Sequence, residues 1–161
     1  MAKRDKSVGI EEDASSSYNR DGRVTRVKYN ALVRNFLRNK EMTVSWLMDT
    51  GMMANERDCR ICKKKMSLSP CRDRKDGMRW ECRRSLEGKR HRCERSIRER
   101  SWFEGANLTI SEVLKFTYWW CAGLNQVQIN VQLGMAPSTL VDWDMFCREL
   151  CGVVLSSANA N

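Results

Sequence analysis

The chain has 161 residues, eight cysteines, one histidine and a net charge of +9 at pH 7. Its start lacks the apolar core of about 7–15 residues that a secretory signal needs, and no stretch reaches the roughly 18 apolar residues of a membrane span. We therefore expect an intracellular protein, nuclear if its source is eukaryotic, whose clustered cysteines are reduced and indicate a metal site.

The sequence predicts a mainly α fold with a small β zinc ribbon, arranged as a helical N-terminal segment, the ribbon and a three-helix C-terminal segment. Residues 1–21 are polar, with too few apolar side chains to bury, so they are expected to be a disordered tail. Residues 22–56 are expected to form short helices, with Thr43 as a cap for the second helix and Gly51 as its stop. An apolar stripe at helical spacing supports the first helix: Tyr29, Leu32, Val33, Phe36 and Leu37.

Residues 57–104 are expected to form a basic zinc ribbon. They show little helical periodicity, Pro70, Gly77 and Gly88 interrupt them, and they hold five of the eight cysteines and the one histidine. Within them, residues 57–100 carry 17 Lys/Arg against 7 Asp/Glu, a net charge of +10. Short strands and turns around a metal ion are the structure expected from this composition.

The cysteine spacing predicts three ligands of a zinc ion. Cys59 and Cys62 form a C-x2-C pair, in which a tight turn directs both sulfurs at one ion, and Cys82 follows after a loop of ordinary ribbon length. The fourth ligand is either His91 or Cys93, and the spacing alone leaves both open. Four protein ligands close the coordination shell and leave no place for an activated water, so the expected role of the zinc is structural.

The local excess of positive charge predicts a polyanion-binding surface, with DNA as the expected partner. Lys and Arg side chains pair with phosphates and give salt-dependent affinity, and because phosphate contacts do not distinguish DNA from RNA, RNA stays open as a partner. The alternative is an ordinary solvated charged surface. The candidate contact residues of the ribbon are Lys63, Lys64, Lys65, Arg72, Arg74, Lys75, Arg83, Arg84, Lys89, Arg90 and Arg92.

Residues 105–151 are expected to form three helices. Thr109 and Glu112 fit a capping box at the start of the first helix, and Pro137 stands in the first turn of the third. Residues 152–161 fade into small polar side chains and are expected to be a second disordered tail. Apolar side chains predict the buried side of the third helix: Val141, Met145, Phe146, Leu150 and Cys151.

The middle helix of this segment is predicted against a competing pattern. Residues 125–133 alternate between apolar and polar side chains, which taken alone favours a strand. Asn125 with Gln128 forms a cap pair, however, and Gly134 is a typical stop, so a short helix is the preferred interpretation.

Two helices, a turn and a third helix form the layout of a helix-turn-helix, in which the third helix reads the major groove. Its first residues, Ser138 and Thr139, are then candidate nucleic-acid contacts. Acidic side chains on the same helix oppose contacts with phosphate: Asp142, Asp144 and Glu149. A three-helix packing unit is therefore the alternative, with a homodimer or a protein partner bound through residues 105–151.

Four motifs in this order resemble the N-terminal region of Merlin-type DNA transposases, which are related to bacterial insertion sequences. The motifs are C-R-I-C-K-K-K-M (59–66), D-G-M-R-W-E-C-R-R (76–84), G-K-R-H-R-C-E-R-S-I-R-E-R-S-W-F (88–103) and S-T-L-V-D-W-D-M-F-C-R-E-L-C (138–151). The resemblance implies a zinc-binding and helix-turn-helix region that recognises the ends of the element. It places Cys59, Cys62 and Cys82 at ligand positions and favours His91 as the fourth.

In that family an RNase-H-like domain with an acidic catalytic triad follows, and strand transfer requires carboxylates gathered around two metal ions. Here Asp142 and Asp144 fall on the predicted third helix, and no other spaced carboxylates follow. We therefore expect a non-catalytic, transposase-derived DNA-binding protein. Two alternatives stay open: a protein-interaction module that uses the ribbon and the Trp-rich helix over residues 109–121, and a truncated fragment of an active transposase.

Overall fold

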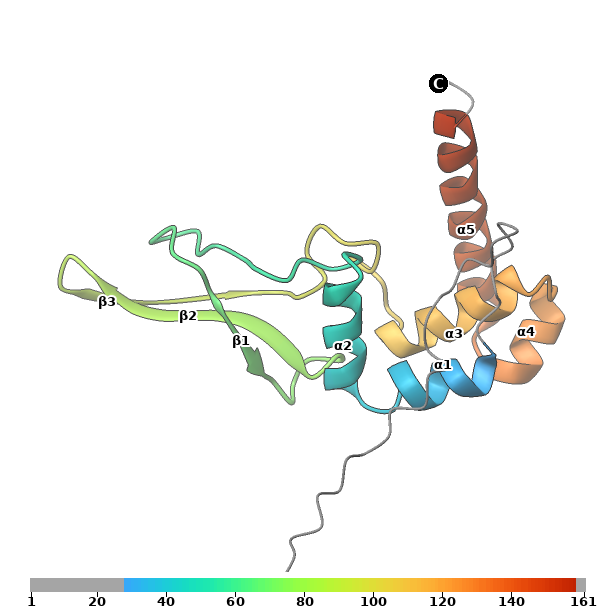
Figure 1. Ribbon diagram of the computed structural model, residues 1–161, viewed down its shortest axis with the longest axis horizontal. Coiled ribbons are helices and arrows are strands. Elements are labelled where there is room, and N and C mark those ends of the chain that lie inside the picture. Colours follow the sequence, from blue (N-terminus) through green and yellow to red (C-terminus); the bar gives the residue numbers. More distant parts are fainter. Residues whose placement is uncertain (1–27, 159–161) are drawn as a thin grey trace, which may run out of the picture.

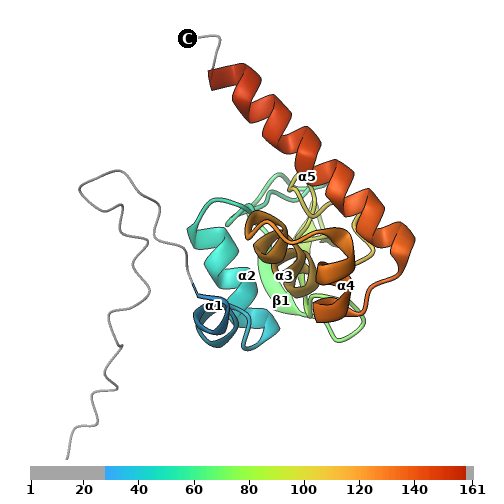
Figure 2. The same ribbon diagram turned by 90° about the vertical axis from the view of Figure 1, so that its right-hand side faces the viewer.

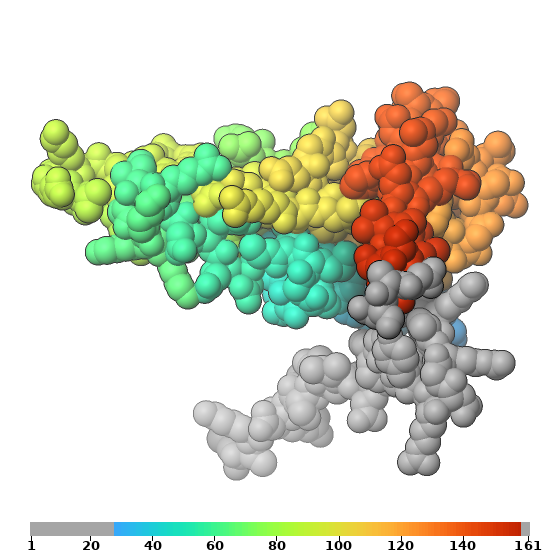
Figure 3. Space-filling model, turned by 90° about the horizontal axis from the view of Figure 1, so that it is seen from above, coloured from blue at the N-terminus to red at the C-terminus, as the bar shows by residue number. Residues whose placement is uncertain are grey.

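The computed structural model describes residues 28–158, so the tail expected over residues 1–21 lies outside the described residues. The described part contains five helices and one three-stranded antiparallel sheet (Figure 1). This confirms the expected combination of helices with a small β element. Seen from above, the molecule is elongated, with the sheet at one end and the C-terminal helices at the other (Figure 3).

Two short helices open the described chain, α1 (Tyr29–Phe36) and α2 (Lys40–Asp49). The cap of α2 is Asn39, whose side chain accepts a hydrogen bond of 2.8 Å from the backbone N–H of Met42. The prediction of Thr43 as this cap was wrong. Thr43 lies inside the helix, and its hydroxyl donates to the carbonyls of Phe36 and Asn39, each at 2.9 Å. Gly51 ends the helix as predicted, with a φ of 74° that favours glycine.

The sheet consists of β1 (Ser67–Pro70), β2 (Met78–Leu86) and β3 (Lys89–Arg95), paired in chain order. Strands β2 and β3 form a hairpin whose turn, Glu87-Gly88, has positive φ at both positions, 51° and 78°. Such a two-residue turn fits the right-handed twist of a hairpin. Figure 1 shows the hairpin reaching away from the helices, with its turn at the far end.

Three helices follow, α3 (Ile110–Cys121), α4 (Gln126–Leu133) and α5 (Pro137–Ala158). Both predicted caps are confirmed: capping boxes begin α3 at Thr109 and α4 at Asn125. Gly134 ends α4 in the left-handed conformation, with a φ of 62°. The alternating residues before it therefore form a helix, because the cap and the stop specify the helical ends.

Helix α5 departs from the prediction in two respects. It continues without a break to Ala158, so the part of the predicted tail that the structure describes, residues 152–158, is helical. Its buried side chains are Leu140, Trp143 and Cys147. The five side chains predicted to be buried are exposed: Val141, Met145, Phe146, Leu150 and Cys151. Apolar residues stand on several faces of this helix, so their spacing could not identify the face that meets α3 and α4.

A single cluster of buried apolar side chains runs from α2 through the sheet to α5, and Phe103 and Phe116 are fully buried within it. A buried ion pair between two residues that flank the strands lies beside this cluster. The guanidinium of Arg98, after β3, donates to both carboxylate oxygens of Asp76, in the loop between β1 and β2, at 2.5 and 2.7 Å. Asp76 also accepts the backbone N–H of Ile110 at 3.2 Å, so it fixes the first turn of α3.

Candidate metal site and basic surface

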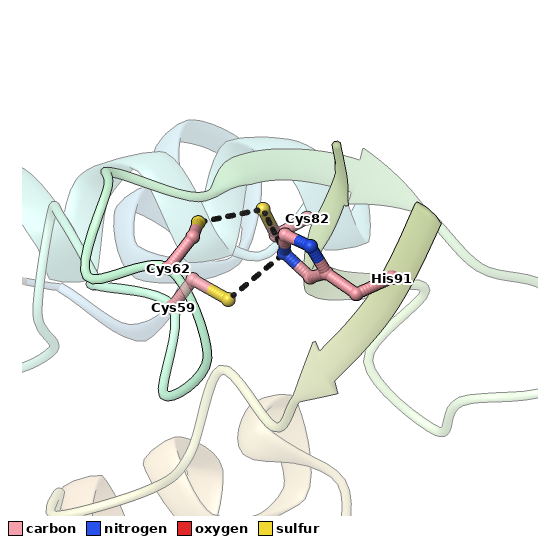
Figure 4. Close-up of side chains that lie close together, drawn as sticks. All are labelled: Cys59, Cys62, Cys82 and His91. Carbon is pink, nitrogen blue, oxygen red and sulfur yellow. Dashed lines mark hydrogen bonds between the residues drawn. The ribbon is translucent and has the colours of Figure 1, made fainter. Parts of the chain in front are cut away.

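Four side chains from three parts of the chain converge on one point (Figure 4). Cys59 and Cys62 come from the loop before β1, Cys82 from β2 and His91 from β3, and their ligand atoms all lie within 4.8 Å of one another. The Nε2 atom of His91 lies 3.6 Å from Sγ of Cys59 and 3.5 Å from Sγ of Cys82. The sulfurs of Cys62 and Cys82 are 3.8 Å apart. The group can hold a metal ion.

The loop that presents the first two cysteines is a tight turn closed by backbone hydrogen bonds. The N–H of Cys59 donates to the carbonyl of Lys64, and the N–H of Lys63 donates to the carbonyl of Cys59, both at 2.9 Å. Lys63 has a φ of 59°, the left-handed value that lets the chain reverse. The N–H of Ile61 points at Sγ of Cys59, 3.4 Å away. The turn therefore directs the sulfurs of Cys59 and Cys62 and the backbone N–H of Ile61 towards the same side of the loop.

The strand register explains why the histidine joins the group. Cys82 is directly opposite Cys93, and Arg84 is directly opposite His91, so all four side chains lie on one face of the hairpin. His91 reaches diagonally across this face to the sulfur of Cys82. The structure therefore brings the predicted ligands Cys59, Cys62, Cys82 and His91 together, and leaves the alternative ligand Cys93 outside the group.

The site stabilises the deprotonated form of one cysteine, Cys59, and disfavours deprotonation of a second, Cys82. Burial raises the pKa of the Cys59 thiol, but backbone N–H groups of Cys62 and Ile61, together with His91, lower this pKa to about 6. For Cys82, burial and the neighbouring thiols of Cys62 and Cys59 raise the pKa to about 11. A second thiolate is thus opposed by the first, and a cation placed between the sulfurs removes this repulsion.

The predicted basic residues fall into two separate groups. The hairpin group comprises those in the cysteine loop and on the outer half of the β2–β3 hairpin: Lys63, Lys64, Lys65, Arg83, Arg84, Lys89, Arg90 and Arg92. The loop group, in the β1–β2 connection, lies at the opposite end of β2 and consists of Arg72, Arg74 and Lys75. All of these side chains are exposed. The single basic surface inferred from composition is therefore divided.

Several of the predicted contact residues already have acidic partners. Arg83 and Arg92 pair with Glu81 at 2.9 and 3.2 Å, and Arg92 also pairs with Glu94 at 2.6 Å. Burial raises the pKa of Glu81, but its arginine neighbours outweigh burial and hold that pKa below its usual value. Lys65 pairs with Glu56. A sum of charges along the sequence does not show which side chains pair; the cross-strand pair of Arg92 with Glu81 joins residues 11 positions apart.

The remaining cations of the hairpin group have no carboxylate partner within the described part of the chain. Arg84 donates to the carbonyl of Lys65 at 3.0 Å, which leaves its charge uncompensated. An open hollow of about 520 Å³ lies at this end of the hairpin, lined by Arg83, Arg84, Ser85, Arg90, His91 and Arg92. His91 thus belongs both to the candidate metal ligands and to the wall of this hollow, so the candidate metal site lies directly beside the basic surface.

The other predicted contacts, Ser138 and Thr139, stand at the start of α5, and Ser138 is exposed. Figure 1 shows this helix at the opposite end of the molecule from the hairpin turn, so the structure does not bring them together with the hairpin group. Asp144 accepts hydrogen bonds from the Trp120 indole at 2.7 Å and the Arg148 guanidinium at 3.0 Å. Its carboxylate therefore fastens α5 to α3.

None of the helices formed by residues 28–158 is long and apolar enough to cross a membrane. No protein-family model, curated protein or solved structure matches the chain.

Proposed function

We propose that Cys59, Cys62, Cys82 and His91 bind a structural zinc ion, which makes residues 57–104 a zinc ribbon. Sulfur and imidazole nitrogen are ligands that zinc prefers, at about 2.3 and 2.0–2.1 Å. A regular tetrahedron with these radii has edges of about 3.8 Å between two sulfurs and about 3.5 Å between sulfur and nitrogen. The observed separations of 3.8, 3.5 and 3.6 Å agree with those edges.

The ligand set also supports a structural role for the ion. Three thiolates and one imidazole fill a tetrahedral shell, which leaves no open position for a reacting water. Cys59 is fully buried and Cys82 is 3% exposed, so the ion would lie inside the fold. It would tie the cysteine loop to β2 and β3, and the free energy of metal binding would then stabilise the folded loop.

We propose further that the hairpin group binds the phosphates of a nucleic acid, DNA in the first instance. The observation that carries this proposal is the hollow lined by arginines beside the metal site. Lys89 and Arg90, next to the turn of the β2–β3 hairpin, are exposed and have no carboxylate partner among residues 28–158. When such side chains pair with phosphates, counterions are released from the nucleic acid. This gives an affinity that does not depend on the base sequence.

The test is the salt dependence of DNA binding by the zinc-loaded chain. The double variant Lys89→Gln/Arg90→Gln should lower the slope of log affinity against log salt by about 2, since each lost phosphate contact accounts for about 0.9. A matched control, Arg72→Gln/Arg74→Gln, removes the same charge from the loop group. An equal loss of slope in both variants would mean that net charge, not the hairpin, governs binding.

The resemblance to Merlin-type transposases suggests the origin of such a protein, and we propose a non-catalytic, transposase-derived role. The bonding of Asp144 supports this, because its carboxylate is engaged by Trp120, Gln126 and Arg148 on the helices. A carboxylate held in this way contributes to packing and is not free to share in a two-metal centre.

A second candidate function is protein interaction. The surface that favours it is the exposed apolar side of α5, whereas the sequence predicted the Trp-rich helix over residues 109–121. The aromatic side chains of α3 are covered by α1: the ring of Tyr29 lies 5.3 Å from that of Tyr118 and 4.7 Å from that of Trp119. Trp120 donates to Asp144 and is also only partly exposed. The Trp-rich helix therefore offers little free apolar surface, and the exposed apolar side chains stand on α5.

A further inference from the structure

Three aromatic side chains meet where the connection between β3 and α3 packs against α5. The rings of Trp102 and Phe146 are nearly parallel, at 10°, with their centroids 5.8 Å apart. The ring of Trp143 is perpendicular to both, at 88 and 87°, with centroid distances of 5.4 and 5.6 Å. Trp143 is only 8% exposed, whereas Phe146 is 39% exposed and Trp102 is partly exposed. The group therefore has one buried ring and two that solvent can reach.

An open hollow of about 230 Å³ is lined by all three of these rings. One water molecule takes up about 30 Å³ in the liquid, so the hollow has room for a group of several non-hydrogen atoms. Gly105 and Ala106 line it as well, together with two carboxylates, those of Glu104 and Asp142. Among the described residues, no lysine, arginine or histidine lines this hollow.

The two carboxylates at the hollow are not neutralised within residues 28–158. Glu104 accepts the backbone N–H of Arg100 at 2.8 Å, a bond that leaves its charge in place. Asp142 has no ion pair or hydrogen bond to this part of the chain, and both residues are exposed. The hollow thus combines aromatic rings with two negative charges, although the whole chain has a net charge of +9.

This combination is suited to a cation that carries apolar groups. The face of an aromatic ring attracts a cation that lies within about 6 Å of its centre, and the carboxylates add full negative charges. The same carboxylates repel phosphate, which argues against a nucleic acid as the ligand of this hollow. An unmodified lysine ammonium is strongly hydrated, whereas methylation keeps its charge and adds methyl groups that contact the rings.

We propose that this hollow binds the methylated ammonium group of a lysine side chain on a partner protein. A free small molecule is normally buried over about 70–90% of its surface, whereas an open hollow of this size covers only the end of a side chain. A dimethylated lysine retains one N–H, which either carboxylate can accept. The inference goes beyond the proposed zinc and nucleic-acid binding and depends on neither.

Nuclear magnetic resonance titration of the full chain tests this binding. The probe is the peptide Gly-Gly-Lys-Gly-Gly with blocked ends and a dimethylated lysine. The indole N–H signal of Trp102, assigned through its loss in Trp102→Phe, should shift with a dissociation constant on the order of 1 mM. Two further peptides should each bind at least about 10-fold more weakly. One has an unmodified lysine, and in the other a carbon atom replaces the charged nitrogen.

Two variants test the carboxylates and the rings separately. Asp142→Asn removes one charge and Phe146→Leu removes one exposed ring, and each should weaken binding of the dimethylated probe by about 5- to 10-fold. Both positions are exposed, so far-UV circular dichroism should show unchanged helix content. The matched control, Asp49→Asn, removes the same charge from an exposed position on α2 and should leave the affinity unchanged.

Three results would overturn the proposal. The first is the absence of any shift of the Trp102 signal at about 10 mM dimethylated probe. The second is equal binding of the peptide with carbon in place of nitrogen, which would reduce the site to an apolar hollow. The third is an equal loss of affinity in Asp142→Asn and Asp49→Asn, which would mean that net charge alone attracts the probe.

Discussion

Replacing Asp76 by alanine should be among the most destabilising single changes in this chain. The side chains of Asp76 and Arg98 are each only 9% exposed, and the guanidinium binds both carboxylate oxygens. Removing one partner of a buried pair leaves an uncompensated charge and costs about 3–5 kcal/mol. The N–H of Ile110 loses its acceptor at the same time. Since a small protein has a total stability of about 5–15 kcal/mol, a large share of it should disappear.

Thermal unfolding of the zinc-loaded protein, followed by circular dichroism, measures this loss. At about 2–4 °C per kcal/mol for a chain of this size, the midpoint should fall by about 6–20 °C. The control Glu56→Gln breaks an ion pair whose side chains are 71 and 64% exposed, and should cost less than about 1 kcal/mol. The double variant Asp76→Leu/Arg98→Met should recover much of the loss, because apolar groups replace both charges. A midpoint for Asp76→Ala within 2–3 °C of wild type, at about 1 kcal/mol or less, would refute the reasoning.

Three further predictions concern the metal site and the acid behaviour of the fold. His91→Ala should lower the zinc content of purified protein, whereas Cys93→Ser should leave it unchanged, as elemental analysis would show; the opposite pattern would assign the fourth position to Cys93. A chelator should accelerate amide exchange in the cysteine loop, residues 57–66, and unchanged exchange there would contradict a structural role for the metal. Hydrogen bonds from Arg95 and Arg60 outweigh the effect of burial and lower the pKa of Glu99 from 4.5 to about 2. The ionised Glu99 therefore stabilises the folded state above pH 4.5, and this stabilisation is lost as the pH falls towards 2. Urea unfolding of Glu99→Gln should therefore differ from wild type at neutral pH and converge with it in acid; a constant difference would argue against this ion pair.

Local rules predicted the features that depend on neighbouring residues. The capping boxes at Thr109 and Asn125 and the stop at Gly134 were correct, because a cap is satisfied within one helical turn. The metal group was also predictable, since the cysteine spacing fixes a turn, while the choice of His91 over Cys93 required the hairpin register. Residue spacing alone does not give that register.

Features that depend on distant segments were missed. Thr43 has the side chain of a cap, but the helix begins earlier, at Asn39, and the threonine hydroxyl instead bonds to the carbonyls of the preceding turn. The buried face of α5 was misplaced because the helix is apolar on several sides, and only the positions of α3 and α4 decide which side is covered. The pairing of Arg92 with Glu81 likewise arises from the strand register, which charge counting ignores.

The continuous apolar cluster that joins the sheet to the helices bears on how this chain can be divided. Its members extend from Val44 on α2 through Trp80 on β2 to Cys147 on α5, and Asp76 crosses the same boundary by accepting the backbone N–H of Ile110 on α3. A cut between the sheet segment, residues 57–104, and the helices would expose both halves of this cluster to water. Residues 57–104 are thus not a detachable module: recombination or protein engineering that transplants them must carry along the helical surface on which they pack.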